Sequence, residues 1–194
     1  MFLVPSDQVS KAFWEFSVDL FTREGVEANC LLLQDRYGLN VNLTLLCLWA
    51  GLSGRPALKS TDITSAIAAS AHWHGSVVEP LRQIRRVVQA VGKIGDSDLS
   101  GIRRSLLHDE LAAERIEQSA IVSALPGIES TTLGLDARLT NTLNSLSAYL
   151  LSTHIQLDTP GRRALYAIIH SVFDEIPRNK LARMANRIIS EPVP

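Results

Sequence analysis

The sequence predicts an all-α fold, a single globular bundle of seven to eight helices with a central, apolar third helix. Apolar residues recur every three or four positions along almost the whole chain, which is the period of an amphipathic helix. No run shows the strict alternation and the β-branched and aromatic clusters that are typical of a strand. Glycine, proline and capping residues divide the periodic stretches into segments of helical length.

The first three helices are predicted over residues 10–21, 26–37 and 41–52. Gly38 follows the second helix, at the position where a residue in the left-handed conformation commonly ends a helix. Asn40 is a suitable N-cap for the third helix. Because the third helix is apolar nearly all round, we expect it at the centre of the bundle.

A fourth helix begins near residues 60–62 and continues, with a kink near Gly75 or Pro80, to Val91. A turn over residues 92–97 follows. The later helices have similar start and stop signals, among them Pro126 after the fifth helix and the Asp158 cap with a proline in the first turn of the seventh. They are predicted over residues 98–125, 135–152, 159–173 and 177–189.

The chain length and composition predict one domain in a reducing compartment. Residues 10–125 are expected to form the main helical body, with residues 126–194 packed on it, since the connection between them is short. Cys30 and Cys47 lie in apolar runs, and the N-terminus does not resemble a signal peptide. The longest apolar stretch is shorter than the ~20 residues that span a membrane. These features favour a cytoplasmic protein.

The fifth predicted helix places acidic residues where apolar ones are expected. At 100° per residue, its apolar arc includes Ile102, Ile116 and further leucines, isoleucines and alanines. Glu110, Glu114 and Glu117 fall within the same arc. A buried carboxylate without a partner is very costly, so we expect cations opposite these glutamates.

The fourth helix supplies candidate cations, because Arg85 flanks its apolar stripe and Arg82 and Arg86 lie further round the helix. Arginine stays charged when buried and pairs with carboxylates through parallel hydrogen bonds. Three interpretations stay open: a buried ionic lock that fixes the helix register, a solvated rim, or a polar cleft that binds an anionic ligand or holds a tuned acid. Glu110, Glu114 and Glu117 with the three arginines are therefore the candidate ligand or ion-network residues.

No motif of a common enzyme class occurs. The sequence lacks the signatures of P-loop, dinucleotide-binding, zinc-protease, serine-hydrolase and di-iron proteins. His72 and His74 diverge by about 200° around a helix, which argues against a shared metal ion, and Trp73 between them is expected to anchor the core. We therefore assign no catalytic residue, metal site or cofactor, although an unfamiliar enzyme stays open.

The last predicted helix carries a basic face, and it is the candidate surface for a macromolecular partner. The face consists of Arg178, Lys180, Arg183 and Arg187. Such a face is usually only solvated, but it could also dock an acidic protein surface or nucleic-acid phosphates. The whole chain has 19 basic and 20 acidic residues, so its net charge gives no general attraction to nucleic acid or to an anionic membrane.

Several segments together resemble a known family. The most specific is Leu-Gln-Asp-x-x-Gly-x-x-Val over residues 33–41, preceded by Trp14-Glu15-Phe16-Ser17 and Cys30-Leu31. With the Arg82–Arg86 and Glu110–Gln118 segments, it is similar to a family of short proteobacterial all-helical proteins known only as a domain of unknown function. The resemblance covers about residues 10–120. It implies a bacterial cytosolic protein and supplies no activity, cofactor or catalytic residue.

The functional expectation is a non-catalytic adaptor or regulatory protein that binds another macromolecule, most simply another protein. One alternative is an enzyme or small-molecule binder with a polar cleft formed by Arg82, Arg85, Glu110 and Glu114. The other is nucleic-acid binding through the basic last helix. The sequence does not specify the ligand, the partner or the oligomeric state.

Overall fold

A computed structural model describes residues 5–91, 96–125 and 130–189. Within these ranges the chain forms helices joined by turns and contains no strand. The helices are α1 (Pro5–Phe21), α2 (Val26–Tyr37), α3 (Val41–Leu52), α4 (Ser60–Trp73), α5 (Glu79–Ala90), α6 (Asp96–Ser123), α7 (Leu135–Ser152), α8 (Thr159–Val172) and α9 (Arg178–Ile189). A π turn, η1 (His74–Val78), joins α4 to α5 in one continuous rod. The described residues therefore form eight helical rods, which confirms the predicted all-α class.

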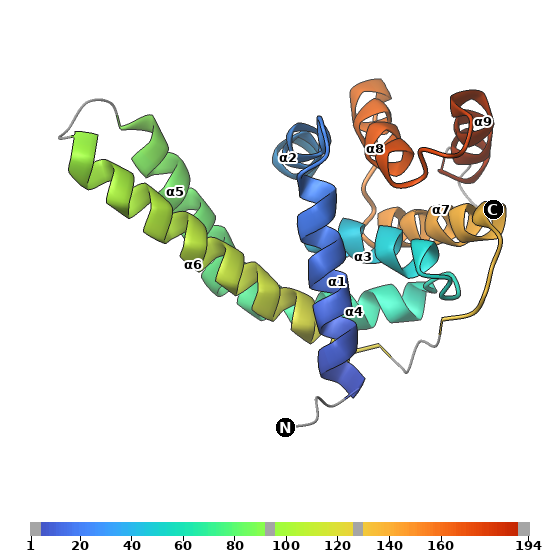
Figure 1. The fold of residues 1–194 in the computed structure, drawn as a ribbon, viewed down its shortest axis with the longest axis horizontal. Helices are drawn as coiled ribbons and strands as arrows, with labels where there is room; N and C mark the ends of the chain where they lie inside the picture. Colours follow the sequence, from blue (N-terminus) through green and yellow to red (C-terminus); the bar gives the residue numbers. More distant parts are fainter. Residues whose placement is uncertain (1–4, 92–95, 126–129, 190–194) are drawn as a thin grey trace.

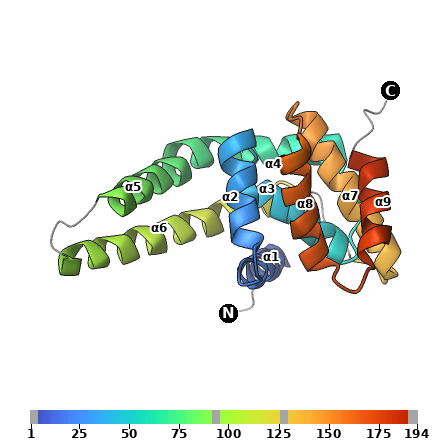
Figure 2. The same cartoon turned by 90° about the horizontal axis from the view of Figure 1, so that it is seen from above.

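Helix α3 lies at the centre of the fold, as predicted. Every residue from Asn42 to Gly51 is buried. Helices α1, α2, α4, α6, α7 and α8 all contact α3, and Figures 1 and 2 show them around it. An apolar helix is stable in water only when all its faces are covered in this way, so the composition of α3 organises the bundle.

Local signals set the ends of α2 and α3. Gly38 adopts the left-handed conformation, with φ of 70°, and its N–H donates to the carbonyl of Gln34 at 3.0 Å. Two residues later, the Asn40 side chain accepts hydrogen bonds from the backbone N–H groups of Asn42 (2.8 Å) and Leu43 (3.3 Å). These contacts satisfy groups that a helix end leaves unpaired. They also fix Asn40 at the edge of the functional site described below.

Helices α3 and α7 cross closely at Gly51. A β-carbon on Gly51 would come within 2.0 Å of the Thr142 hydroxyl oxygen, 2.6 Å of the Thr142 backbone nitrogen and 2.8 Å of the Arg138 carbonyl oxygen. Two of these three atoms belong to the backbone and cannot move aside without shifting α7. The approach of α7 to α3 therefore depends on the missing side chain of Gly51.

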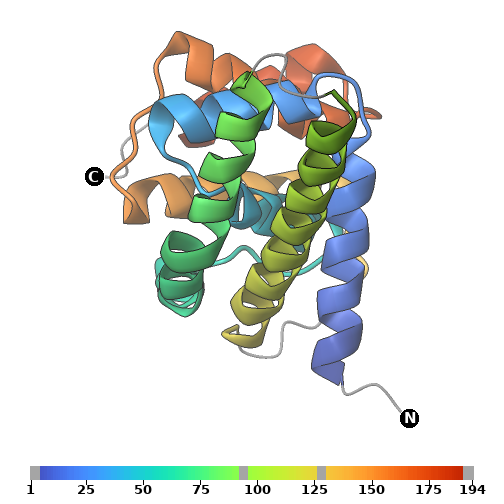
Figure 3. The same cartoon turned by 90° about the vertical axis from the view of Figure 1, so that its left-hand side faces the viewer.

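Helices α5 and α6 form an antiparallel arm that projects beyond the other helices (Figures 1 and 2), and Figure 3 shows the two helices side by side. Figure 2 shows α2 crossing over the root of the arm. Ile84 on α5 is 50% exposed, and Ile102 and Ile116 on α6 are 50% and 53% exposed. The predicted apolar arcs were thus drawn too wide here, because each helix of a two-helix arm covers only a narrow stripe of the other.

The predicted kink near Gly75 or Pro80 takes the form of the π turn η1, which lies between α4 and Pro80. Proline has no N–H to donate to the preceding turn. Consistent with a widened turn, the N–H of Glu79 donates to the carbonyl of His74, five residues earlier. Single π turns inside helices frequently occur at functional sites, and this one determines where His74 points.

The C-terminal helices share one apolar core with the N-terminal ones. Helix α7 packs on α3, α8 packs on α2, and α9 packs on α7 and α8. Asp158 caps α8 by accepting the Gly161 N–H at 3.1 Å, as its position before Pro160 predicted. Helix α6 already begins at Asp96, within the predicted turn over 92–97, whose residues 92–95 lie outside the described ranges, as does Pro126.

Two further sequence features have a place in the fold. Cys30 and Cys47 are free and buried, and burial raises the pKa of both thiols, that of Cys30 to about 12. Both thiols therefore stay protonated and poorly nucleophilic. None of the helices in the described ranges combines the length and the apolar character that crossing a membrane requires.

Candidate functional site

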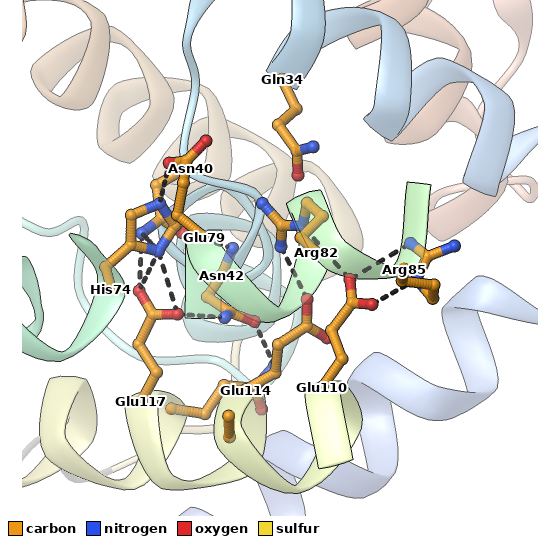
Figure 4. A network of polar contacts seen from close by, with 12 residues as sticks. Gln34, Asn40, Asn42, His74, Glu79, Arg82, Arg85, Glu110, Glu114 and Glu117 are labelled. Carbon is orange, nitrogen blue, oxygen red and sulfur yellow. Dashed lines mark hydrogen bonds and ion pairs between the residues drawn. The ribbon is translucent and has the colours of Figure 1, made fainter. Parts of the chain in front are cut away.

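Helix α6 carries a buried arginine–glutamate network along its side facing α5 (Figure 4). Arg82 Nε donates to Glu110 Oε1 at 3.3 Å, and Arg82 Nη2 donates to Glu114 Oε1 at 2.7 Å. Arg85 donates to Glu110 through Nε, at short range, and through Nη2 at 3.2 Å. The side chains of Arg82 and Glu110 are only 7% and 5% exposed. One carboxylate thus holds two guanidinium groups at the root of the arm.

A second cluster surrounds Glu117, one turn further along α6 (Figure 4). Glu117 is fully buried. Its carboxylate accepts hydrogen bonds from Asn40 Nδ2 (2.6 Å) and Asn42 Nδ2 (2.9 Å), and His74 Nδ1 lies 3.1 Å from Glu117 Oε1. These groups come from the cap of α3, from α3 itself and from the π turn. Glu117 therefore ties three parts of the fold to α6.

The buried polar groups continue from Glu117 to helix α1. Gln118 Nε2 donates to Asn42 Oδ1 at 2.8 Å and to the Ser17 hydroxyl at 3.1 Å. Ser17 in turn donates to the carbonyl of Phe13 at 2.9 Å. Buried polar groups that are fully hydrogen-bonded in this way fix the relative positions of the helices that carry them.

The two clusters differ in how well their carboxylates are compensated. Burial acts to raise the pKa of Glu117, but the hydrogen bonds from His74, Asn40 and Asn42 outweigh it, and the pKa lies below the ordinary value. The same contact raises the pKa of His74, because the hydrogen bond to Glu117 favours the protonated imidazole. Burial raises the pKa of Glu114 in spite of Arg82. The cost of burying the charge of Glu114 is thus only partly offset by Arg82.

A cleft of about 330 Å³ opens beside Glu114, between α1, α2, α3 and α6. Its volume lies at the lower end of the range for small-ligand sites. Apolar side chains form one wall, and polar side chains from the two clusters form the other. The lining residues are Trp14, Ser17, Val18, Phe21, Thr22, Glu27, Val41, Asn42, Leu45, Leu111, Glu114 and Gln118. Arg82 and Arg85 are not among them, since their guanidinium groups are turned to Glu110 and Glu114.

The structure brings together five of the six network candidates in two neighbouring clusters, but Arg86 lies apart. Its Nη2 donates to Asp35 Oδ1, which links α5 to the crossing helix α2 at the surface. On the arm, the face of α5 toward α6 carries Arg82 and Arg85, and the face toward α2 carries Arg86. Arg86 therefore contacts α2 and leaves the glutamates to the other two arginines.

The basic face of α9 lies on the far side of the molecule from the arm (Figures 1 and 2). Lys180 Nζ lies 2.7 Å from Asp136 Oδ1 and joins α9 to α7. Arg178, Arg183 and Arg187 are exposed. The four residues thus form no continuation of the network, and nucleic-acid binding there stays a prediction.

His74 is the site residue that sequence reasoning missed. A rotation of 100° per residue, which the prediction from the sequence assumes, holds only in a regular α-helix. The π turn over residues 74–78 adds a residue to one turn, so the direction of His74 relative to Arg82 does not follow from that rule. Trp73 is half-buried and donates through Nε1 to the Ala113 carbonyl at 2.9 Å, which anchors α4 to α6. The pairing of Asn40 with Glu117 is also invisible in the sequence, where Asn40 is interpreted as the cap of the third helix.

In the described ranges, no three His, Cys, Asp or Glu side chains converge in a way that could hold a metal ion. The chemical capacity of the site lies in the cleft, where a half-compensated carboxylate faces an apolar wall. That arrangement is suited to binding.

The His74–Glu117 contact predicts a stability maximum in mildly acidic solution. Glu117 has a lowered pKa, so it stabilises the fold above its ordinary value of 4.5, and this contribution is lost as the pH falls through its folded pKa. His74 has a raised pKa, so it stabilises below its ordinary value of 6.5, and this contribution is lost as the pH rises through its folded pKa. The free energy of unfolding should therefore be highest between these two values.

Urea unfolding between pH 4 and pH 8 tests this expectation. The His74→Gln variant should lose most of the decline on the alkaline side, because glutamine does not titrate. His108, which is 84% exposed, provides the matched control, and His108→Gln should leave the profile unchanged. An alkaline decline that persists in His74→Gln would contradict the assignment.

The fold and the site together define a class: an all-helical protein in which a buried arginine–glutamate network adjoins an open, partly apolar cleft. The family model described as "Protein of unknown function (DUF2390)" matches residues 12–121, more than half of the chain, and the protein belongs to this family. The match runs from α1 nearly to the end of α6, so it includes every residue of both clusters. No curated protein and no solved structure matches the chain.

Proposed function

We propose that this protein is a non-catalytic adaptor that binds another protein at the cleft beside Glu114. The observation that carries the proposal is the cleft of about 330 Å³, whose apolar wall continues onto the exposed surface. Val18 and Leu111 line the cleft and are 48% and 42% exposed. Apolar side chains that gather at a rimmed hollow are typical of interaction sites.

The projecting arm supports a macromolecular partner over a free small molecule. Leu107 and Leu111 lie one helical turn apart on α6 and are 47% and 42% exposed. The apolar surface therefore extends from the cleft along the arm, further than a ligand confined to the cleft would cover. The proposal includes a bacterial, cytoplasmic setting, which the family resemblance and the two buried free thiols support.

A small-molecule binder or an enzyme is the second candidate, and one observation favours it. Glu114 faces the cleft with a pKa raised by burial, as a general acid or a ligand-binding acid would. A binder of this kind would need only the cleft, so the exposed surface of the arm distinguishes the two functions.

Partner capture by two arginine variants of α6 tests the adaptor proposal. Leu111→Arg places a charge at the cleft mouth, whereas Ile116→Arg places the same charge on the same helix outside the lining, at a residue that is 53% exposed. Both substitutions are at exposed positions and should change the melting temperature little. A protein captured by the wild type and Ile116→Arg, but at least tenfold less by Leu111→Arg, is the expected result.

The outcome against the proposal is equally specific. If Leu111→Arg and Ile116→Arg capture the same proteins in the same amounts as the wild type, the cleft is not the adaptor surface. Loss of capture in both variants would also count against it, because a general charge effect would then explain the result.

A further inference from the structure

We infer that the cleft receives one basic side chain, a lysine or an arginine, carried by an apolar segment of the partner protein. This inference rests on the proposed function and specifies the chemistry of the partner. It follows from three properties of the cleft: an incompletely bonded carboxylate, a lining without cations, and an apolar wall.

The first property is the free oxygen of Glu114. Glu114 Oε1 accepts the hydrogen bond from Arg82, at 2.7 Å, whereas Oε2 accepts none within the described ranges. A carboxylate offers about four acceptor positions, and the Glu114 side chain is 22% exposed. Oε2 therefore has acceptor capacity left, on a side chain that lines the cleft and is partly exposed. Burial already raises the pKa of Glu114, so a cation there would restore its ionised form.

The second property is the sign of the charge. The lining contains the carboxylates of Glu27 and Glu114 and no lysine, arginine or histidine among the described residues. Glu27 is exposed at the rim, and Arg115 lies over the Trp14 ring, 5.9 Å from its centroid, without belonging to the lining. Arg82 offsets part of the charge of Glu114, and Glu27 keeps the lining negative, which attracts the opposite sign of charge. This disfavours the anionic ligand that the arginine-rich sequence of α5 had left open.

The third property is the apolar wall, which fits the stem of a long basic side chain. Trp14, Val18, Phe21, Leu45 and Leu111 contribute to it. Lysine and arginine bury their methylene stems along apolar surface while the charged end reaches a polar group. The aromatic ring of Phe21 adds a favourable surface for a cation. A charged end at Glu114 with a stem along this wall uses both sides of the cleft.

Titration with small probes tests the charge requirement. The probes are n-hexylammonium, n-butylguanidinium, 1-hexanol and hexanoate, and the signal is the indole N–H resonance of Trp14, assigned with a Trp14→Phe variant. The two cations should shift the resonance saturably, hexanol should bind about tenfold more weakly, and hexanoate should bind no better than hexanol. Equal binding of hexanoate and hexylammonium would overturn the inference.

Glu114→Gln should weaken the binding of n-hexylammonium about tenfold, because the amide keeps the shape and an acceptor for Arg82 but removes the charge. A thermal melt establishes that this variant is folded. Glu27→Gln, at the exposed rim, provides a variant independent of the network and should weaken binding about twofold to threefold. Unchanged binding in both variants would overturn the inference.

Competition separates this inference from the adaptor proposal. Excess n-butylguanidinium should displace a partner that is captured in a Leu111-dependent manner. If the cations bind but the partner stays bound, the basic side chain is not the occupant, although the adaptor function stands. If no Leu111-dependent partner exists and the cations bind, the cleft is a site for free organic cations, and the side-chain assignment fails.

Discussion

Replacing Glu110 by alanine is expected to lower the free energy of unfolding by about 3–5 kcal/mol. The carboxylate is 5% exposed and accepts hydrogen bonds from both Arg82 and Arg85. Its removal leaves Arg82, 7% exposed, bonded to Glu114 alone, and leaves Arg85 without a hydrogen-bonded carboxylate among the described residues. An uncompensated buried charge costs far more than the net value of the pair, which is why the expected loss is large.

Urea unfolding measures this loss, and Asp109→Ala is the matched control. Asp109 neighbours Glu110 on α6 but is 61% exposed, and its removal should change stability by less than about 0.5 kcal/mol. A double-mutant cycle adds a sharper test. Arg85→Ala should cost little in the Glu110→Ala background, because its partner is already absent. A Glu110→Ala loss no larger than that of Asp109→Ala would show that the network does not stabilise the arm.

Replacing Gly51 by alanine is expected to destabilise the protein by about 3 kcal/mol, at the upper end of the range for overpacked cores. In an exposed helix the same change stabilises by about 0.5–1 kcal/mol, since glycine costs more backbone entropy than alanine. At Gly51 the change in stability has the opposite sign, because the new β-carbon would lie 2.6 Å from the Thr142 backbone nitrogen. Relief of this overlap requires α7 to move away from α3.

Gly101→Ala is the matched control for this prediction. Gly101 lies within α6, and apart from the backbone of its own turns no atom of the described residues lies within 4 Å of the position of its β-carbon. The control variant should gain stability by roughly 0.5–1 kcal/mol in the same urea titration, so that the two glycine variants shift in opposite directions. A Gly51→Ala variant that is as stable as the wild type would mean that α3 and α7 cross less closely than described.

Most helix boundaries follow from the sequence, because their causes are local. The predicted ranges 26–37, 41–52 and 135–152 agree with α2, α3 and α7 at both ends. A left-handed glycine or a capping asparagine acts on hydrogen bonds within one turn, so neighbouring residues contain the whole signal. The predicted first helix began at residue 10, whereas α1 begins at Pro5, so its first turn was not predicted.

The core-facing acids are a more instructive case. Glu110, Glu114 and Glu117 interrupt an apolar arc, and the cost of burying charge was enough to infer that cations lie opposite them. The identity of the cations was only partly predictable. Arg82 and Arg85 lie on the expected face of the preceding helix, whereas the partners of Glu117 come from α3 and the π turn. No local pattern links these residues, because more than forty positions separate each of them from Glu117 in the sequence.

By itself, the sequence determined the helical class, the ends of most helices, the central place of α3 and the need to neutralise acids on α6. Each depends on periodicity, capping or the energetics of burial, which act over a few residues or on a single side chain. The tertiary structure decided where His74 points, how the arm projects and which oxygen of Glu114 accepts the hydrogen bond from Arg82. These features depend on the packing of distant helices, and a shift of one turn in that packing would rearrange all of them.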